Sequence, residues 1–141
     1  MVDYEIIEHT ADIGIRVKGK DLKAVFENSA LAMFTLICQA ISRPSDTKIK
    51  KTGFKIKQKA GDLEELLVNW LNELLSLSSA KGLIFTDFVI RKLDKDSLEA
   101  EVYGEDIKDY KVNTEIKAAT YHRLKIQESD GIWQAEIIFD V

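Results

Sequence analysis

The sequence predicts an α+β protein, a single layered domain over residues 1–141 in which two main helices pack on a mainly antiparallel or mixed β-sheet. Two segments carry apolar residues three and four positions apart, the spacing of a helix that buries one face. Much of the remaining chain alternates apolar and polar residues, as half-buried strands do. The helical segments are too few, and the strand-like segments too often adjacent, for a repeating strand–helix–strand chain.

The first strand is predicted around Ile13, Ile15 and Val17, which alternate with small or charged residues. Residues 19–20 then turn the chain. The side chain of Asp21 can accept hydrogen bonds from the free amides at the start of a helix, so we expect a helix to begin directly after it.

The first helix is expected to run to about Ile41, before Pro44. The second helix follows Asp62, the expected N-cap, with Glu65 three residues further on as in a capping box. Gly82 is a typical stop signal for this second helix. The apolar stripe of the second helix consists of Leu63, Leu66, Leu67, Trp70, Leu71, Leu74 and Leu75.

The rest of the chain is predicted to form strands joined by tight turns. Asp94-Lys95-Asp96 and Ser129-Asp130-Gly131 each separate two strand-like runs and indicate β-hairpins. The predicted strands around these turns and before the second helix cover residues 54–57, 83–93, 97–104, 121–127 and 132–141.

The composition narrows the classes of function. The 141 residues are 45% hydrophobic, enough for a core, and the formal net charge is −4. So small a net charge argues against binding long nucleic acid by bulk electrostatic attraction. The single cysteine, Cys38, excludes an internal disulfide and a cysteine-based zinc site, and we expect a buried, unreactive thiol in an apolar helical segment. No leader-like segment and no long apolar run is seen, so we expect a cytoplasmic protein without membrane contact.

Two aspartates near opposite ends of the sequence are candidate metal ligands. Asp12 lies on the opposite strand face from the apolar residues that follow it, and Asp140 lies opposite the apolar residues of the last strand. Two carboxylates brought together repel unless a cation lies between them. With the terminal carboxylate of Val141 they would form an oxygen-only site, typical of calcium or magnesium. The alternative is two unrelated surface aspartates.

The two histidines, His9 and His122, suggest a second class of function. Together with Asp12 and Asp140 they could form a metal-dependent phosphoesterase site. No Gly-x-Ser-x-Gly, HExxH or glycine-rich phosphate-binding motif accompanies them. A satisfied His122 in a strand and a turn-capping His9 are the structural alternatives.

The segment 43–59 is rich in lysine and suggests a third class, an RNA-binding module. A basic strand that includes Lys55 and Lys57 could contact an RNA backbone. The alternative, which we favour, is an edge strand whose lysines prevent unwanted strand pairing. Lys117, further on, has no physical feature that marks it as functional.

Several segments, in order along nearly the whole chain, resemble the archease family. They are "EHTADIGI", Met33-Phe34 with an alanine shortly before, "DLEELLVNWLNELL", "IKAATYHRL" and the closing "AEIIFDV". No one of these segments would suffice, but together they make the resemblance specific.

The resemblance implies a protein cofactor without enzymatic activity of its own. It would activate an RtcB-type tRNA-splicing ligase, promoting the GTP-dependent guanylylation and the multiple turnover of that ligase, and would meet RNA only through the ligase. The resemblance also implies a Ca²⁺ ion, with Mg²⁺ as the alternative, held by Asp12, Asp140 and Val141. Lys117 matches a lysine that is important for activation in the family.

Overall fold

The computed structural model of the chain describes residues 3–8, 12–44 and 47–141, and at positions 8, 122 and 123 the backbone alone. Within these ranges, neither α-helix has the length and apolar character needed to cross a membrane. The elements are β1 (Tyr4–Glu8), β2 (Asp12–Gly19), α1 (Leu22–Ile37), β3 (Cys38–Ala40), β4 (Thr52–Lys59), α2 (Leu63–Lys81), β5 (Leu83–Leu93), β6 (Ser97–Asp106), the 3₁₀ helix η1 (Ile107–Asp109), β7 (Tyr110–Val112), β8 (Ala118–Ser129) and β9 (Ile132–Asp140).

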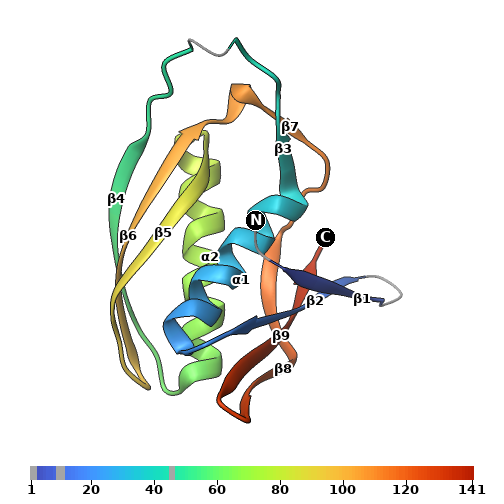
Figure 1. Cartoon of the computed structure of the whole chain (residues 1–141), viewed down its shortest axis with the longest axis vertical. Coiled ribbons are helices and arrows are strands. Elements are labelled where there is room, and N and C mark those ends of the chain that lie inside the picture. Colours follow the sequence, from blue (N-terminus) through green and yellow to red (C-terminus); the bar gives the residue numbers. More distant parts are fainter. Residues whose placement is uncertain (1–2, 9–11, 45–46) are drawn as a thin grey trace.

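The strands form three antiparallel groups around the two helices. A four-stranded sheet has the order β1-β2-β9-β8, a three-stranded sheet the order β4-β6-β5, and β3 pairs with β7. The helix pair lies between the two larger sheets, with α1 against β2 and β5 and α2 against β8 and β5 (Figure 1). The predicted α+β class with two helices packed on antiparallel strands is therefore confirmed, although the strands divide into separate sheets.

Helix α2 begins and ends as its sequence predicts. The side chain of Asp62 accepts a hydrogen bond from the backbone N–H of Glu65 at 2.8 Å. At the other end Gly82 adopts the left-handed conformation, with φ of 64°, which glycine adopts without steric cost. The apolar stripe is buried except at Leu63 and Leu75, which are partly buried. The indole Nε1 of Trp70 donates to the carbonyl oxygen of Phe26 in α1 at 3.0 Å. This bond satisfies a polar atom inside the core and ties the two helices together.

Helix α1 starts as predicted but ends earlier. Asp21 caps it, accepting from the N–H of Ala24 at 2.8 Å. The predicted end near Ile41 is wrong, because the backbone is already extended at Cys38, where β3 begins and pairs with β7. The carbonyl of Ile37 accepts from the N–H of Asn113 at 2.7 Å. A partner strand distant in sequence thus replaces the last helical turn, which local periodicity does not reveal.

Cys38 lies at the first residue of β3 and is buried. Burial raises the pKa of its thiol to about 11. The thiol is therefore protonated near neutral pH, as an unreactive structural cysteine should be.

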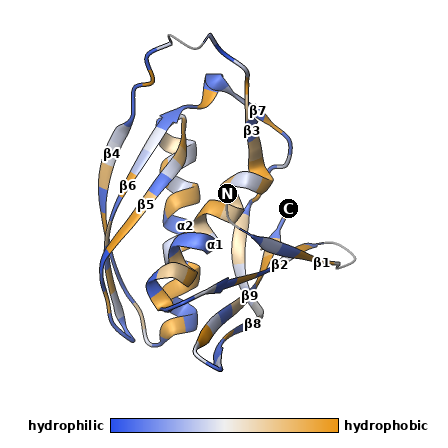
Figure 2. Ribbon diagram, in the orientation of Figure 1, coloured by the Kyte–Doolittle hydropathy of each residue, from blue (hydrophilic) through white to orange (hydrophobic). Residues whose placement is uncertain are grey.

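The two predicted hairpins are both present. In the β5–β6 turn the N–H of Asp94 donates to the carbonyl of Ser97 at 2.9 Å. In the β8–β9 turn Asp130 and Gly131 both have positive φ, 53° and 77°, as the central pair of a type I′ turn requires. Hydrophilic and hydrophobic residues alternate along many of the strands (Figure 2), so each sheet presents an apolar face to the helices.

Candidate functional site

The structure places Asp12 and Asp140 directly opposite each other in neighbouring strands. They are partners in the antiparallel register of β2 and β9. Side chains at directly opposite positions have Cβ atoms about 4.5–5.5 Å apart. Asp12 is half-buried, whereas Asp140 and Val141 are exposed at the end of the chain, which lies beside the β1–β2 hairpin (Figure 1).

The core of the protein sets this juxtaposition. On the inner face of the same two strands, Ile15 is the register partner of Ile137 and Val17 that of Ala135, and all four side chains are fully buried. A slip of one residue would turn these apolar side chains outward, so the register is strongly specified. The same register places the two aspartates opposite each other on the outer face.

Lys117 lies at the same end of the sheet. Its backbone N–H donates to the carbonyl oxygen of Asp140 at 2.8 Å, and the next residue, Ala118, is the register partner of Asp140 in β8. The side chain of Lys117 is exposed. The backbone of Lys117, just before β8, thus adjoins Asp140 at the sheet end where Asp12 and Asp140 face each other. We refer to these three residues and Val141 as the polar tip.

Asn72 of α2 supports the polar tip and was missed from sequence. Its side-chain Oδ1 accepts from the N–H of Ala119 at 2.8 Å, and its Nδ2 donates to the carbonyl of Ala119 at 3.2 Å. The available signal was an asparagine beside the apolar stripe of a leucine-rich helix. Such a residue needs a polar partner where the helix packs on a sheet.

The donor set of the polar tip fits a hard cation. It offers two side-chain carboxylates and the terminal carboxylate of Val141, all oxygen donors of the kind that Ca²⁺ and Mg²⁺ prefer. Among the residues that the structure describes, no three or more His, Cys, Asp or Glu side chains gather in a metal-binding group. A cation at this place would therefore need the terminal carboxylate, backbone carbonyls or water to complete its coordination shell.

The nearby arginine does not neutralise the aspartates. Arg16 shares the outer face of β2 with Asp12, but its guanidinium binds Glu136 at 2.7 Å and Glu5 at 2.7 Å. The hydrogen bonds that Arg16 donates to the carboxylate of Glu136 raise the pKa of Arg16 above its usual value. Neither Asp12 nor Asp140 forms an ion pair with a lysine or arginine in the part of the chain that the structure describes.

The structure does not test the two histidines of the phosphoesterase hypothesis. His9 lies outside the described residues, and only the backbone is described at His122.

The lysine-rich segment forms an edge strand, as favoured from sequence. β4 lies at the edge of its sheet and pairs with β6 alone. Lys55 lies opposite Glu101 and Lys57 opposite Glu99, with the Nζ of Lys57 at 3.7 Å from a Glu99 carboxylate oxygen. Each of these lysines therefore has an acidic cross-strand neighbour, so this face of the strand is not a concentrated positive patch.

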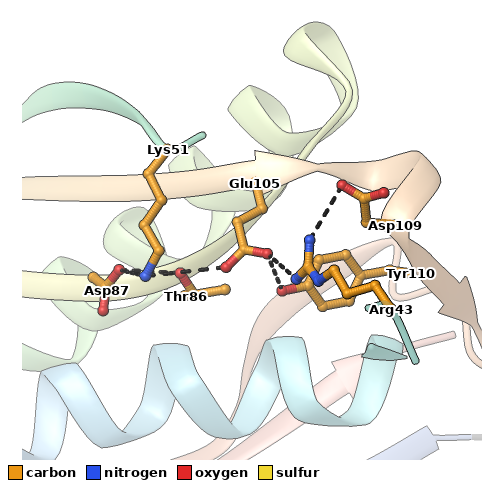
Figure 3. A network of polar contacts seen from close by, with 7 residues as sticks. All are labelled: Arg43, Lys51, Thr86, Asp87, Glu105, Asp109 and Tyr110. Carbon is orange, nitrogen blue, oxygen red and sulfur yellow. Dashed lines mark hydrogen bonds and ion pairs between the residues drawn. The ribbon is translucent and has the colours of Figure 1, made fainter. Parts of the chain in front are cut away.

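Two further basic residues of this segment are held in an internal network (Figure 3). The buried carboxylate of Glu105 binds Arg43 at 2.7 Å and accepts from the hydroxyl of Tyr110 at 3.1 Å. Lys51 pairs with Asp87, and its Nζ lies 4.0 Å from the other oxygen of Glu105. Burial, together with Glu105, raises the pKa of Tyr110 to about 12. Arg43 and Lys51 therefore anchor the connection between β3 and β4.

The fold defines a class of small α+β proteins in which two helices lie between antiparallel sheets. Residues 4–141 match the model of the Archease protein family, and the chain belongs to this family. The family resemblance seen in the sequence is thereby confirmed.

Relatives cover the chain almost completely. Protein archease of Pyrococcus furiosus is 40% identical over 148 residues, covering 100% of both chains. Protein archease of Methanosarcina barkeri is 38% identical, covering 98% of this chain and 95% of its own length. The solution structure of Methanobacterium thermoautotrophicum protein 1598 has a TM-score of 0.76 at 33% identity, with 98% of each chain covered. An archease crystal structure from Thermotoga maritima has a TM-score of 0.65 at 21% identity, covering 96% of this chain and 94% of that one, and shares the fold.

Proposed function

We propose that this protein is a non-enzymatic cofactor that activates an RtcB-type RNA-splicing ligase. It would promote the GTP-dependent guanylylation of the ligase and its multiple turnover in tRNA splicing or RNA repair, in the cytoplasm, and would reach RNA only through the ligase. The observation that carries the proposal is the convergence of Asp12, Asp140 and Lys117 on one sheet end in a chain of this family.

The polar tip would hold a Ca²⁺ ion, or Mg²⁺ in its place, through Asp12, Asp140 and the terminal carboxylate of Val141. Such an ion would neutralise the two facing carboxylates and tie the end of β9 to β2. The support for this proposal is the direct register pairing of the aspartates and their all-oxygen donor set.

Lys117 would act on the partner. An exposed lysine whose backbone adjoins Asp140 adds a positive charge to a compact polar projection that can enter the nucleotide-binding cleft of another protein. There it can orient the phosphates of GTP for attack by the histidine of the ligase. Preorganised charges of this kind can supply several kcal/mol of transition-state stabilisation. The mechanism requires no nucleophile in the activator.

A role exerted on another protein has also been considered for a relative of the same fold. The Thermotoga maritima archease is described as a possible chaperone. Chaperoning and ligase activation both act through a protein partner, and an exposed polar tip on a compact fold suits either.

The decisive experiment compares ligation with and without this protein, under single-turnover and multiple-turnover conditions, using the cognate ligase. We expect the parent chain to raise both guanylylation and the number of turnovers. Asp12→Ala and Lys117→Ala should abolish activation while circular dichroism shows the helices intact. Asp96→Ala, which alters an exposed aspartate of the β5–β6 turn, serves as the matched control and should activate fully. Full activation by the Asp12 and Lys117 variants would refute the proposal.

The same preparation tests the competing enzymatic function. Incubated without ligase, the purified chain should not hydrolyse a panel of phosphodiesters in the presence of calcium or magnesium. Metal-dependent turnover by the chain alone, lost in Asp12→Ala, would favour the phosphoesterase instead.

A further inference from the structure

The side chain of Asn72 forms two hydrogen bonds with one residue of β8. Oδ1 accepts from the N–H of Ala119 at 2.8 Å, and Nδ2 donates to the carbonyl of the same residue at 3.2 Å. A carboxamide carries the same donor and acceptor as a peptide group. Asn72 therefore pairs with Ala119 much as a residue of a neighbouring strand would.

This pairing satisfies backbone groups at the edge of a sheet. β8 is one of the two edge strands of the β1-β2-β9-β8 sheet, and Ala119 is buried under α2. A buried backbone N–H or carbonyl without a partner is costly. One helical side chain supplies both partners at this position and so fixes where the start of β8 lies relative to α2.

Lys117 immediately precedes β8. Two residues before Ala119, the N–H of Lys117 binds the carbonyl of Asp140 at 2.8 Å. The segment 117–119 is thus held by β9 through Asp140 and by α2 through Asn72. Asn72 and Lys117 line one groove of about 640 Å³ between α2 and residues 115–118, with Ser76, Ser79 and Glu115.

We propose that Asn72 is a positioning residue that sets the location of Lys117 for partner activation. The inference rests on the proposed function and adds a residue of α2 to the residues on which activation depends. Helix α2 is capped at both ends and packed in the core, so it provides a rigid reference for a lysine that precedes an edge strand. Loss of the two hydrogen bonds between Asn72 and Ala119 frees the backbone at 117–119 without removing any charge from the polar tip.

The test combines a ligase assay with backbone amide exchange measured by NMR on the full-length chain without ligase. Asn72→Ala should speed exchange at Ala119 and Lys117 by about tenfold or more, while the amides of β4 and β6 keep their rates. In the ligase assay the same variant should lower maximal activation by about tenfold, the effect of losing one or two net hydrogen bonds. The activator concentration at half-maximal effect should change less than about twofold.

Asn69 provides the matched control. It lies on the same helix, and its Nδ2 is 3.4 Å from the carbonyl of Lys59, away from the polar tip. Asn69→Ala should leave both maximal activation and the exchange at Ala119 unchanged. Asn72→Asp keeps the acceptor for the Ala119 N–H but loses the donor. Its maximal activation and its exchange rate at Ala119 should therefore lie between those of the parent and Asn72→Ala. If Asn72→Ala does not fold, Asn72→Asp serves as the test variant.

The outcomes separate this inference from the function on which it rests. If the parent chain activates the ligase and the Asn72 variants activate equally well, the inference is refuted and the proposed function stands. Unchanged exchange at Ala119 in Asn72→Ala also refutes the inference. If the parent chain itself does not activate the ligase, the proposed function fails, and the role of Asn72 in activation fails with it.

Discussion

Replacing Asp140 with asparagine should change stability in opposite directions with and without calcium. Asparagine keeps the shape of the side chain and removes one of two negative charges that face each other across β2 and β9. Two unit charges about 5 Å apart repel by about 0.8 kcal/mol in water, and opposed like charges in a sheet cost roughly that amount. In EDTA we therefore expect Asp140→Asn to be more stable than the parent by about 0.5–1 kcal/mol, or about 2–4 °C in Tm.

With calcium the order should reverse. At a calcium concentration of about 100 times Kd the parent gains about 2.7 kcal/mol, whereas a variant whose Kd is about tenfold weaker gains only about 1.4 kcal/mol. Urea unfolding and thermal melts in EDTA and in calcium measure these differences, and calorimetry measures Kd directly. Asp96→Asn should show neither effect.

Two results would refute this reasoning separately. A parent chain that neither binds calcium nor gains stability from it contradicts the proposed site. A variant that is less stable than the parent in EDTA contradicts the repulsion argument, because the charges would then be stabilised by some other contact.

Three further predictions concern the fold and the competing functions. Asp62→Ala removes the N-cap bond to Glu65 and should lower the free energy of unfolding by about 1 kcal/mol in urea titrations, with α2 still formed. Cys38 should resist alkylation in the folded protein until the pH approaches 11, while the unfolded chain reacts from about pH 8.5. Because its folded pKa is raised, the contribution of this thiol to stability is full below about pH 8.5 and is lost as the pH rises through 11. Reversing the charges of Lys55 and Lys57 should leave ligase activation nearly unchanged, and a large, salt-dependent loss of RNA binding in a gel-shift assay would instead indicate an RNA-binding strand.

Local features of the sequence predicted much of the secondary structure. The caps at Asp21 and Asp62, the stop at Gly82 and the two hairpin turns all appear where expected. Each depends on the chemistry of a few consecutive residues. The predicted end of α1 was wrong because Cys38 pairs with β7. This strand is distant in the chain and too short to have a recognisable pattern. The short strand β1 was likewise absent from the prediction.

The candidate site could be predicted in part from the sequence, and the rest followed from tertiary structure. Alternation along the segments that form β2 and β9 indicated that Asp12 and Asp140 lie on faces away from the core, since the period of a strand is a local property. That the two face each other, that Lys117 lies beside them, and that Asn72 clamps the start of β8 follow only from tertiary structure. The physical reason is that buried contacts between strands distant in the chain set the register, and one sequence read alone does not say which strands will meet.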